Sequence, residues 1–119
     1  MADAARSVAQ QDHSVSLPVR FSEEAASELE AATAYYDEQQ PGLGEAFIDA
    51  IDTALGMLAE WPRSGVPIPG VASGLEIRRA PVPRFPYHLP YVVIEDHVRV
   101  LAVAHDRRRP GYWAPRASE

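Results

Sequence analysis

The sequence VRVLAVAHDRRRPGYW, from Val98 to Trp113, indicates most strongly how this chain folds. Its first eight residues are apolar at nearly every position, so apolar side chains alternate onto both faces of an extended strand. A strand buried on both faces lies inside a sheet, and we therefore predict an inner strand over Val98–His105. Three arginines, a Pro-Gly turn and an aromatic pair follow. The stretch thus predicts a rigid strand that delivers His105, several guanidinium groups and a phenol to one edge of the domain.

The residues upstream predict a helical hairpin. A short strand over Val15–Phe21, with Pro18 at its start or at a sheet edge, precedes a helix that begins after the N-cap Ser22 and ends near Glu38. A second helix, from about Gly44 to Trp61, follows a break of about four residues, which makes the two helices antiparallel. Their predicted core stripes are Ala25, Leu29, Ala32 and Tyr36 on the first helix, and Phe47, Ile51, Ala54, Leu55 and Leu58 on the second.

The rest of the chain predicts a small sheet. After a loop rich in proline and glycine come three strands in close succession, with a tight turn before the last. The loop is Arg63–Gly74, and the strands are Leu75–Val82, Tyr87–Ile94 and Val98–His105. Prolines at positions 83, 86 and 90 are expected to keep neighbouring strands short. The order β-α-α-β-β-β predicts an α+β fold, in which a small, mostly antiparallel sheet packs against an antiparallel helical hairpin. We predict a single domain over residues 15–116 and a flexible tail over residues 1–14.

Composition limits the class of protein. The 119 residues are enough for one domain with a real core. The chain has no cysteine, which excludes disulfides and cysteine-based zinc sites and fits a reducing cytoplasm. No segment reaches the roughly 20 apolar residues that cross a bilayer, and the polar start of the chain lacks the apolar core of a signal peptide. No pair of histidines has a convincing metal-ligand spacing, so we predict no metal site. We also predict no cofactor and no membrane partner.

The charge is unevenly distributed along the chain. Residues 1–60 carry 12 acidic and 2 basic side chains, whereas residues 61–119 carry 5 acidic and 9 basic ones. Every base is arginine, which fits a coding bias because alanine, proline and glycine are also plentiful. The acids of the helical hairpin are interpreted as a solvated face. The basic C-terminal half indicates an anionic partner, either a nucleic acid or an acidic protein segment.

Several local patterns, taken together and in order, resemble a known family. They are Phe21 to Ala25, Ala34 to Tyr36, Pro41 to Gly44 with Phe47, Gly74 to Arg79, Arg84 to Tyr87, Tyr91 to Val93, and Ala104 to Trp113. In this order they resemble the RelE/ParE superfamily of bacterial toxins from type II toxin–antitoxin systems, and the ParE-like members in particular. The resemblance covers about residues 15–116. It implies a cytoplasmic, growth-inhibiting toxin that is neutralised by a cognate antitoxin in a hetero-oligomer.

The superfamily contains two unlike activities, and the fold does not choose between them. RelE-like members cut messenger RNA on the ribosome and need a base, an acid and cationic groups around one phosphate. The resemblance would give these roles to His105, Tyr112, Arg79 and Arg84. Two features count against this hypothesis: the lysines common in ribosome-dependent members are missing here, and the net charge is −6.

ParE-like members inhibit DNA gyrase, which demands a binding surface rather than an acid/base set. The predicted surface, for gyrase or for the antitoxin, comprises Arg78, Arg84, Tyr87, Arg107, Arg108, Arg109 and Trp113. We prefer gyrase inhibition, keep the endoribonuclease as the alternative, and leave open whether the chain is an enzyme. A second alternative is a weakly active binding module whose main partner is an acidic antitoxin segment.

Simpler interpretations of the same residues stay open. His105 at a strand end can serve as a hydrogen-bonded cap, and His88 as a surface residue of its strand. The arginine run can be solvated, and Trp113 can fold back onto the core.

Overall fold

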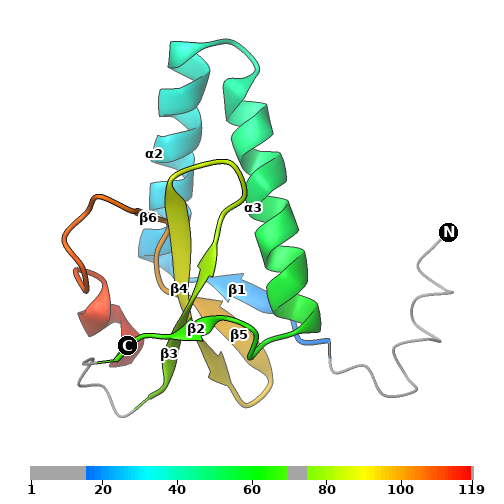
Figure 1. The fold of residues 1–119 in the computed structure, drawn as a ribbon, viewed down its shortest axis with the longest axis vertical. Helices are drawn as coiled ribbons and strands as arrows, with labels where there is room; N and C mark the ends of the chain where they lie inside the picture. The colour runs from blue at the N-terminus through cyan, green and yellow to red at the C-terminus, as the bar shows by residue number, and fades with distance from the viewer. Residues whose placement is uncertain (1–15, 70–74, 119) are drawn as a thin grey trace, which may run out of the picture.

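The computed structural model describes residues 16–69 and 75–118, so the predicted tail over 1–14 and part of the predicted loop lie outside the described residues. The described elements are β1 (Val19–Phe21), α2 (Glu23–Gln39), α3 (Leu43–Glu60), β2 (Val66–Pro67), β3 (Ile77–Pro81), β4 (Tyr87–Ile94), β5 (His97–Val100), β6 (Ala104–His105) and a 3₁₀ turn, η1 (Ala114–Ser118). Figure 1 shows their arrangement.

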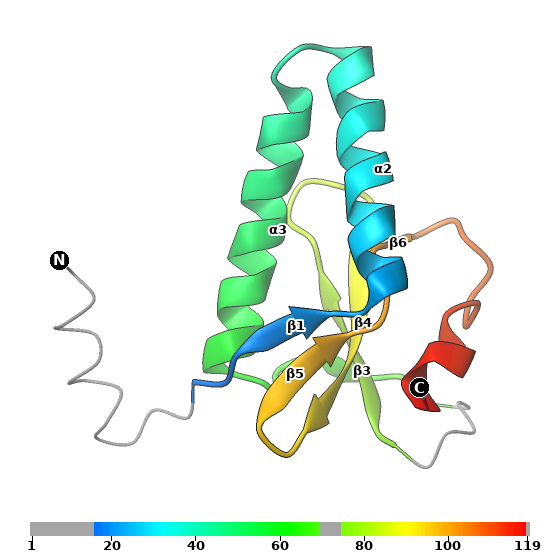
Figure 2. The same ribbon diagram turned by 180° about the vertical axis from the view of Figure 1, so that it is seen from behind.

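One sheet contains all the described strands. Its order is β1-β5-β4-β3-β2, with β6 also paired to β4. The β1–β5 pair is parallel and the other pairs are antiparallel. The two helices lie against one face of this sheet (Figures 1 and 2). The predicted α+β class, the helical hairpin and the inner position of the strand that begins near Val98 are therefore confirmed.

Helix α2 begins where the sequence predicts. The Ser22 hydroxyl oxygen accepts a hydrogen bond from the Ala25 amide at 3.1 Å, and Glu23 and Glu24 lie in the first turn. An N-cap oxygen and first-turn carboxylates both stabilise a helix start. Ser22 is itself buried, and its hydroxyl donates to the Leu101 carbonyl at 3.2 Å. The cap thus also fixes the helix to the sheet.

A tight connection joins α2 to α3. Gly42 precedes α3 with a φ of 91°, a left-handed conformation that glycine adopts without strain. The Asp37 carboxylate accepts hydrogen bonds from the amides of Gly42 and Gly44 at 3.0 and 3.3 Å. Neither helix within the described ranges has the length and apolar character needed to span a membrane.

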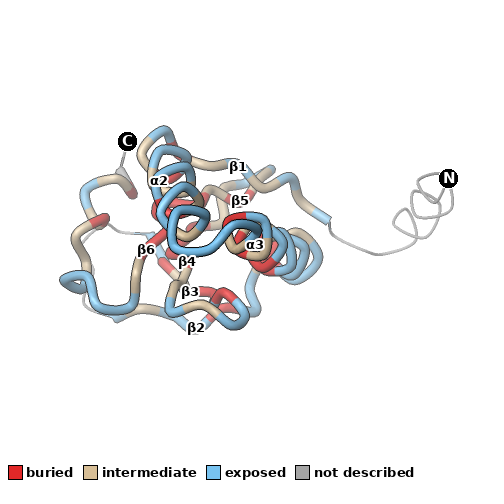
Figure 3. Tube along the Cα trace, turned by 90° about the horizontal axis from the view of Figure 1, so that it is seen from above, coloured by how far each residue is buried: buried red, intermediate tan, exposed pale blue. Residues whose placement is uncertain are grey.

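The sheet separates two apolar clusters. The cluster on the helix side contains Phe47, Ile51 and Leu58 of α3 packed against Leu89 and Tyr91 of β4. The cluster on the other side contains sheet residues together with two C-terminal ones; its buried members are Ile77, Val92, Leu101, Ala102, Ala104, Trp113 and Ala117. Figure 3 shows the outer sides of α2 and α3 exposed. We call the side of the sheet without helices the open face.

The predicted single strand over Val98–His105 is divided, because β5 ends at Val100 and β6 begins at Ala104. Tyr91 pairs with Val100 but His88 pairs with Ala104, so residues 101–103 lie opposite only residues 89–90 of β4. This is a β-bulge. Its cause is Pro90, whose carbonyl accepts from the Leu101 amide at 2.8 Å but which has no N–H to return to the same neighbour.

Strand β2 is absent from the sequence-based prediction, which assigned residues 63–74 to a loop. It has two residues, one of them proline, so no alternation is visible in the sequence. Side chains from β3 and β4 hold it in place. The Gly65 amide donates to the Tyr91 hydroxyl at 2.9 Å, and Arg78 Nη1 donates to the Gly65 carbonyl at 2.7 Å. The predicted strand from Leu75 begins two residues later, at Ile77.

Candidate functional site

Two of the four predicted catalytic residues, Arg79 and His105, lie on opposite faces of the sheet. Arg79 shares the open face with Ile77, since side chains alternate along β3. His105 pairs with Tyr87, whose ring packs 5.1 Å from that of Phe47 in α3, so His105 lies on the helix side. Arg84 is in the loop between β3 and β4 and is not part of the lining of the cavity that the other three residues border. Arg79, His105 and Tyr112 do border one cavity, although from different sides.

His105 is engaged in a turn at the end of β6. Its Nδ1 accepts a hydrogen bond from the Arg107 amide at 3.0 Å, and its carbonyl accepts from the Arg108 amide at 2.9 Å. The ring meets the edge of Tyr87 at 5.0 Å between centroids. These contacts are those of a hydrogen-bonded cap, and they leave Nε2 of His105 as the nitrogen that remains for another partner.

Tyr112 is held by a carboxylate. Its hydroxyl donates to Glu28 Oε2 at 3.0 Å, and the Arg108 guanidinium lies 3.9 Å from the centre of its ring. Burial, together with the adjacent Glu28 carboxylate, raises the pKa of Tyr112 to about 12. The phenol is therefore neutral at physiological pH.

Glu28 is a site residue that is absent from the sequence-based prediction. Its carboxylate accepts from the Val103 amide at 3.0 Å, from Tyr112, and from both terminal nitrogens of Arg116 at 3.1 Å. Arg116 also donates to the Leu101 carbonyl at 3.0 Å. Backbone groups left unpaired by the bulge are thus satisfied by side chains. The sequence does hold a signal, since Glu28 lies between Ala25 and Ala32 on the buried side of α2.

The loop that carries Arg84 is firmly anchored. Arg84 is exposed and has a φ of 67°, which is uncommon for a residue other than glycine. The neighbouring Phe85 packs 5.0 Å from the rings of both Tyr36 and Phe47. Tyr87 joins the same aromatic cluster, and burial raises its pKa. The loop therefore presents Arg84 outward from a fixed backbone.

The remaining predicted contact residues have different environments. Arg78 is partly buried and bonded to Gly65 and Glu76, whereas Arg107, Arg108 and Arg109 are exposed. Trp113 is only 3% exposed and packs in the open-face cluster, as expected if it folds back onto the core. Its contribution to any surface is to anchor the segment that carries the arginines.

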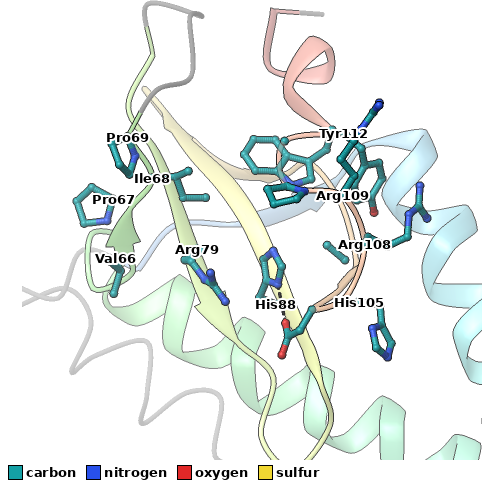
Figure 4. A pocket seen from close by; sticks show the side chains of 15 residues that line it. Val66, Pro67, Ile68, Pro69, Arg79, His88, His105, Arg108, Arg109 and Tyr112 are labelled. Carbon is teal, nitrogen blue, oxygen red and sulfur yellow. Dashed lines mark hydrogen bonds and ion pairs between the residues drawn. The ribbon is translucent and has the colours of Figure 1, made fainter.

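A cavity of about 300 Å³ lies on the open face. Val66 to Pro69 form one wall and Pro110 to Trp113 form the other, with Arg79 and His88 between them (Figure 4). His88 Nδ1 lies 2.8 Å from Asp106 Oδ1. The sequence predicts His88 at the strand surface but does not indicate its pairing with Asp106, because that pairing depends on the register of β4 and β6. Within the described ranges, no group of three or more His, Cys, Asp or Glu side chains could hold a metal ion.

Comparison with known proteins shows the family. A family model described as the ParE toxin of type II toxin–antitoxin system, parDE, matches residues 19–110. A solved structure of the chromosomal ParDE toxin–antitoxin system from P. aeruginosa is 19% identical, covers 77% of this chain and 98% of that chain, and has a TM-score of 0.64.

The YoeB dimer from Staphylococcus aureus is 18% identical over 74% of this chain and 94% of that chain, with a TM-score of 0.47. None of the curated proteins with which the sequence was compared matches it. The resemblance to the RelE/ParE superfamily is confirmed, and the match over residues 19–110 is specific to one branch of it: this chain belongs to the ParE family of type II toxin–antitoxin toxins.

Proposed function

We propose that the chain arrests growth by inhibiting DNA gyrase in the cytoplasm and that a cognate antitoxin neutralises it. Membership of the ParE family implies the antitoxin and favours gyrase over the ribosome as the target. The observation that carries the choice between the two is the distribution of the catalytic candidates over both faces of the sheet.

A nuclease of this superfamily would need its base, its acid and its cations around one phosphate. Arg79 lies on the open face, whereas the ring of His105 lies on the helix side, against Tyr87. The Tyr112 hydroxyl donates a hydrogen bond to Glu28, and with a pKa of about 12 it is poorly matched to proton transfer near pH 7. A binding mechanism requires no such convergence and is therefore favoured.

The loop around Arg84 is the part of the surface best suited to bind gyrase. Its backbone is fixed by Phe85 and by a hydrogen bond from the Tyr87 amide to the Phe85 carbonyl at 2.7 Å. Arg84 is exposed and has no hydrogen-bond or ion-pair partner among the described residues. Because the backbone of this loop is already fixed, binding costs little backbone conformational entropy, and only the Arg84 side chain has to be ordered.

The first experiment identifies the target. After induction without antitoxin, thymidine and methionine incorporation are followed in parallel over the first minutes. We expect thymidine incorporation to fall first, because gyrase inhibition stops replication before translation. An earlier fall in methionine incorporation would instead favour the endoribonuclease.

The second experiment tests Arg84 by a substitution that removes its side chain without straining the backbone. Arg84→Gly suits the left-handed φ of 67°, so the folded state should be at least as stable as that of the parent. We expect inhibition of DNA supercoiling by purified gyrase to weaken at least about tenfold, the effect of losing about 1.4 kcal/mol of binding free energy.

Arg63→Gln is the matched control for Arg84→Gln, since Arg63 is also exposed in a loop and the charge change is the same. If Arg84→Gly and Arg84→Gln inhibit gyrase as well as Arg63→Gln does, the loop is not the gyrase-binding surface.

Messenger RNA cleavage is the second candidate, because Arg79, His105 and Tyr112 do border one cavity. If it is correct, His105→Ala and Tyr112→Phe should abolish RNA cleavage while the variants still fold and bind the antitoxin.

A further inference from the structure

The C-terminal half of α3 exposes an uncharged surface to solvent. Residues 53–59 contain no charged side chain. Met57 is 54% exposed, and Trp61, one turn further along, is 62% exposed. Residues three and four apart lie on the same side of a helix, and Figure 3 shows the outer side of α3 exposed. The surface consists of Thr53, Gly56, Met57 and Trp61, and we call it the α3 face. Adjacent, exposed large apolar side chains of this kind are typical of a surface that a partner covers.

Gly56 weakens α3 without a reason inside the monomer. Glycine within a helix is destabilising relative to alanine. A Cβ atom at Gly56 would meet nothing within 4 Å, whereas one at Gly44 would lie 2.8 Å from the Thr33 carbonyl oxygen. The backbone of Gly56 is helical, so its conformation does not require glycine either. What glycine does provide at this position is room for a second backbone to approach the helix.

The polar groups of the α3 face leave its apolar atoms outward. The Thr53 hydroxyl donates to the Asp49 carbonyl at 3.1 Å, so its own helix satisfies it and its methyl group is available for packing. The Trp61 amide donates to the Met57 carbonyl at 2.7 Å, which keeps Trp61 in line with the last turn. The indole Nε1–H of Trp61 has no hydrogen-bond partner among the described residues and is a free donor.

A second copy of the chain fits the α3 face, whereas an acidic segment is repelled by the carboxylates of the hairpin. In an antiparallel two-fold crossing at Met57, Trp61 of one copy lies opposite Thr53 of the other, because each is four residues from the crossing point. The indole donor then lies next to the Asp52 carboxylate of the other copy. The chain around Arg63, which is exposed, also comes near this carboxylate. The two-fold axis repeats each complementary pair.

We propose that the chain forms a weak two-fold homodimer through the α3 face, with the helices antiparallel and Gly56 close to their crossing point. Four residues per copy form a smaller surface than the roughly 800 Å² per partner of a standard interface, so we expect a dissociation constant of roughly 10–100 µM.

The dimer leaves the loop around Arg84 exposed in both copies. Phe85 anchors this loop on Phe47, which lies ten residues, or about 15 Å, along α3 from Met57. The inference therefore does not rest on gyrase as the target, and the two can be tested separately.

The first test is sedimentation velocity of the full-length toxin from about 2 to about 200 µM, at about 0.3 M salt, which screens the repulsion between two acidic hairpins. We expect the sedimentation coefficient to rise toward that of a dimer and not beyond it, because a two-fold interface is closed. A parent that stays monomeric at about 200 µM, or that forms larger assemblies, overturns the proposal.

Gly56→Gln separates association from folding. Glutamine favours a helix and meets open space in the monomer, so the urea midpoint at about 2 µM should not fall. The same side chain keeps two helices apart, so the dissociation constant should rise at least about tenfold. A merely structural role of Gly56 predicts no such combination.

Ala31→Gln is the matched control for Gly56→Gln. It adds the same side chain to an exposed residue of α2, on the side that borders Val103 and His105. It should change the dissociation constant less than about twofold. Equal effects of the two substitutions on association would contradict the α3 face as the interface.

Tryptophan fluorescence gives a signal from the face itself. The chain has two tryptophans, and Trp113 is only 3% exposed, so a shift of the emission with concentration reports mainly on Trp61. We expect the emission of the parent to move to shorter wavelength as the concentration rises, and Trp61→Phe to abolish this shift. A shift that persists in Trp61→Phe, or one that the parent shows only after antitoxin is added, overturns the proposal; the second result would make the antitoxin the occupant of the face.

Discussion

At Glu28 a single carboxylate joins three parts of the chain. It lies on α2, accepts from the Val103 amide in the bulge, and accepts from Tyr112 and Arg116 in the C-terminal segment. The Glu28 and Arg116 side chains are 21% and 16% exposed, so solvent screens this pair only partly. The arginine run over residues 107–109 therefore lies between two segments, one at Val103 and one at Tyr112 to Arg116, and Glu28 of α2 holds both in place.

We expect Glu28→Gln to lower the free energy of unfolding by about 2 kcal/mol, because it leaves Arg116 without its charged partner and weakens the hydrogen bonds to Tyr112 and Val103. Urea unfolding gives the measurement. Glu30→Gln, which neutralises an exposed carboxylate on the same helix, should change stability by less than about 0.5 kcal/mol. Equal losses from the two substitutions would contradict the role of Glu28.

Because of Tyr112, the free energy of unfolding decreases at alkaline pH. Its pKa is about 12 in the folded protein and about 10 as an ordinary tyrosine, so the unfolded chain releases this proton first as the pH rises. The contribution of this pKa shift to the free energy of unfolding is complete below about pH 10 and is lost between about pH 10 and 12. Burial also raises the pKa of Tyr87 and Tyr91, in the same direction. Unfolding of Tyr112→Phe, followed across this range, should show a smaller alkaline loss than the parent.

The sequence predicts the role of a single residue where the signal is local, but not where the role depends on a distant partner. Ser22 was identified as an N-cap because that signal is local, and the structure confirms it. The pairing of His88 with Asp106 joins residues 18 positions apart and depends on the strand register. Glu28 and Arg116 are 88 positions apart, and only the folded chain brings them together. Site residues that depend on such long-range contacts cannot be assigned from a pattern along one element.

At the scale of elements, the hairpin of α2 and α3 depends on close packing at Gly44. A Cβ atom at this position would lie 2.8 Å from the Thr33 carbonyl oxygen and 3.0 Å from Cβ of Asp37. Both neighbours belong to α2, and one of the two atoms is backbone. The glycine therefore sets the distance between the helices at their connected ends.

We expect Gly44→Ala to destabilise the protein by about 1–3 kcal/mol, because overpacking outweighs the better helix propensity of alanine. Gly56→Ala is the matched control, since Gly56 lies within α3 and a Cβ there would meet nothing within 4 Å. That variant should be more stable by about 0.5–1 kcal/mol. Thermal unfolding distinguishes them, and stabilisation by both substitutions would contradict the close packing.

Elements with strong local signals were predicted well, and those set by tertiary contacts were not. The helices show an apolar stripe of helical period, and β4 was placed at its observed bounds, Tyr87–Ile94. The division of the strand after Val98 was wrong because the residue that causes it, Pro90, lies on the neighbouring strand. Strand β2 has two residues and is held by Arg78 and Tyr91, so nothing within it indicates a strand.

At the scale of the whole molecule, the charges are separated in space. Residues 23–60, which form the helical hairpin, carry ten acidic side chains and no basic one. The exposed arginines lie on the sheet, in the loops that contain Arg63 and Arg84, and in the segment that follows β6. A polyanion or an acidic protein segment is therefore attracted to the sheet and repelled by the hairpin, which orients any encounter.

We expect the change of Arg107, Arg108 and Arg109 to alanine to slow association with an acidic antitoxin segment about tenfold at low salt, and less at high salt. Stopped-flow fluorescence at two ionic strengths measures this. The triple change of Glu45→Gln, Asp49→Asn and Asp52→Asn on the hairpin should leave the rate unchanged or slightly increased. An unchanged rate for the arginine variant would show that the run is merely solvated.

The parallel pairing of β1 with β5 has a consequence for the timing of folding. Val19 pairs with Val98, so 79 further residues must be synthesised before the first strand meets its partner. At about 5–20 residues per second, that interval is roughly 4–16 s. The helical hairpin and the β3–β4 pair need only neighbouring sequence and can form earlier. A nascent chain therefore holds β1 unpaired until residues 98–100 have been synthesised, and the sheet closes only after that point.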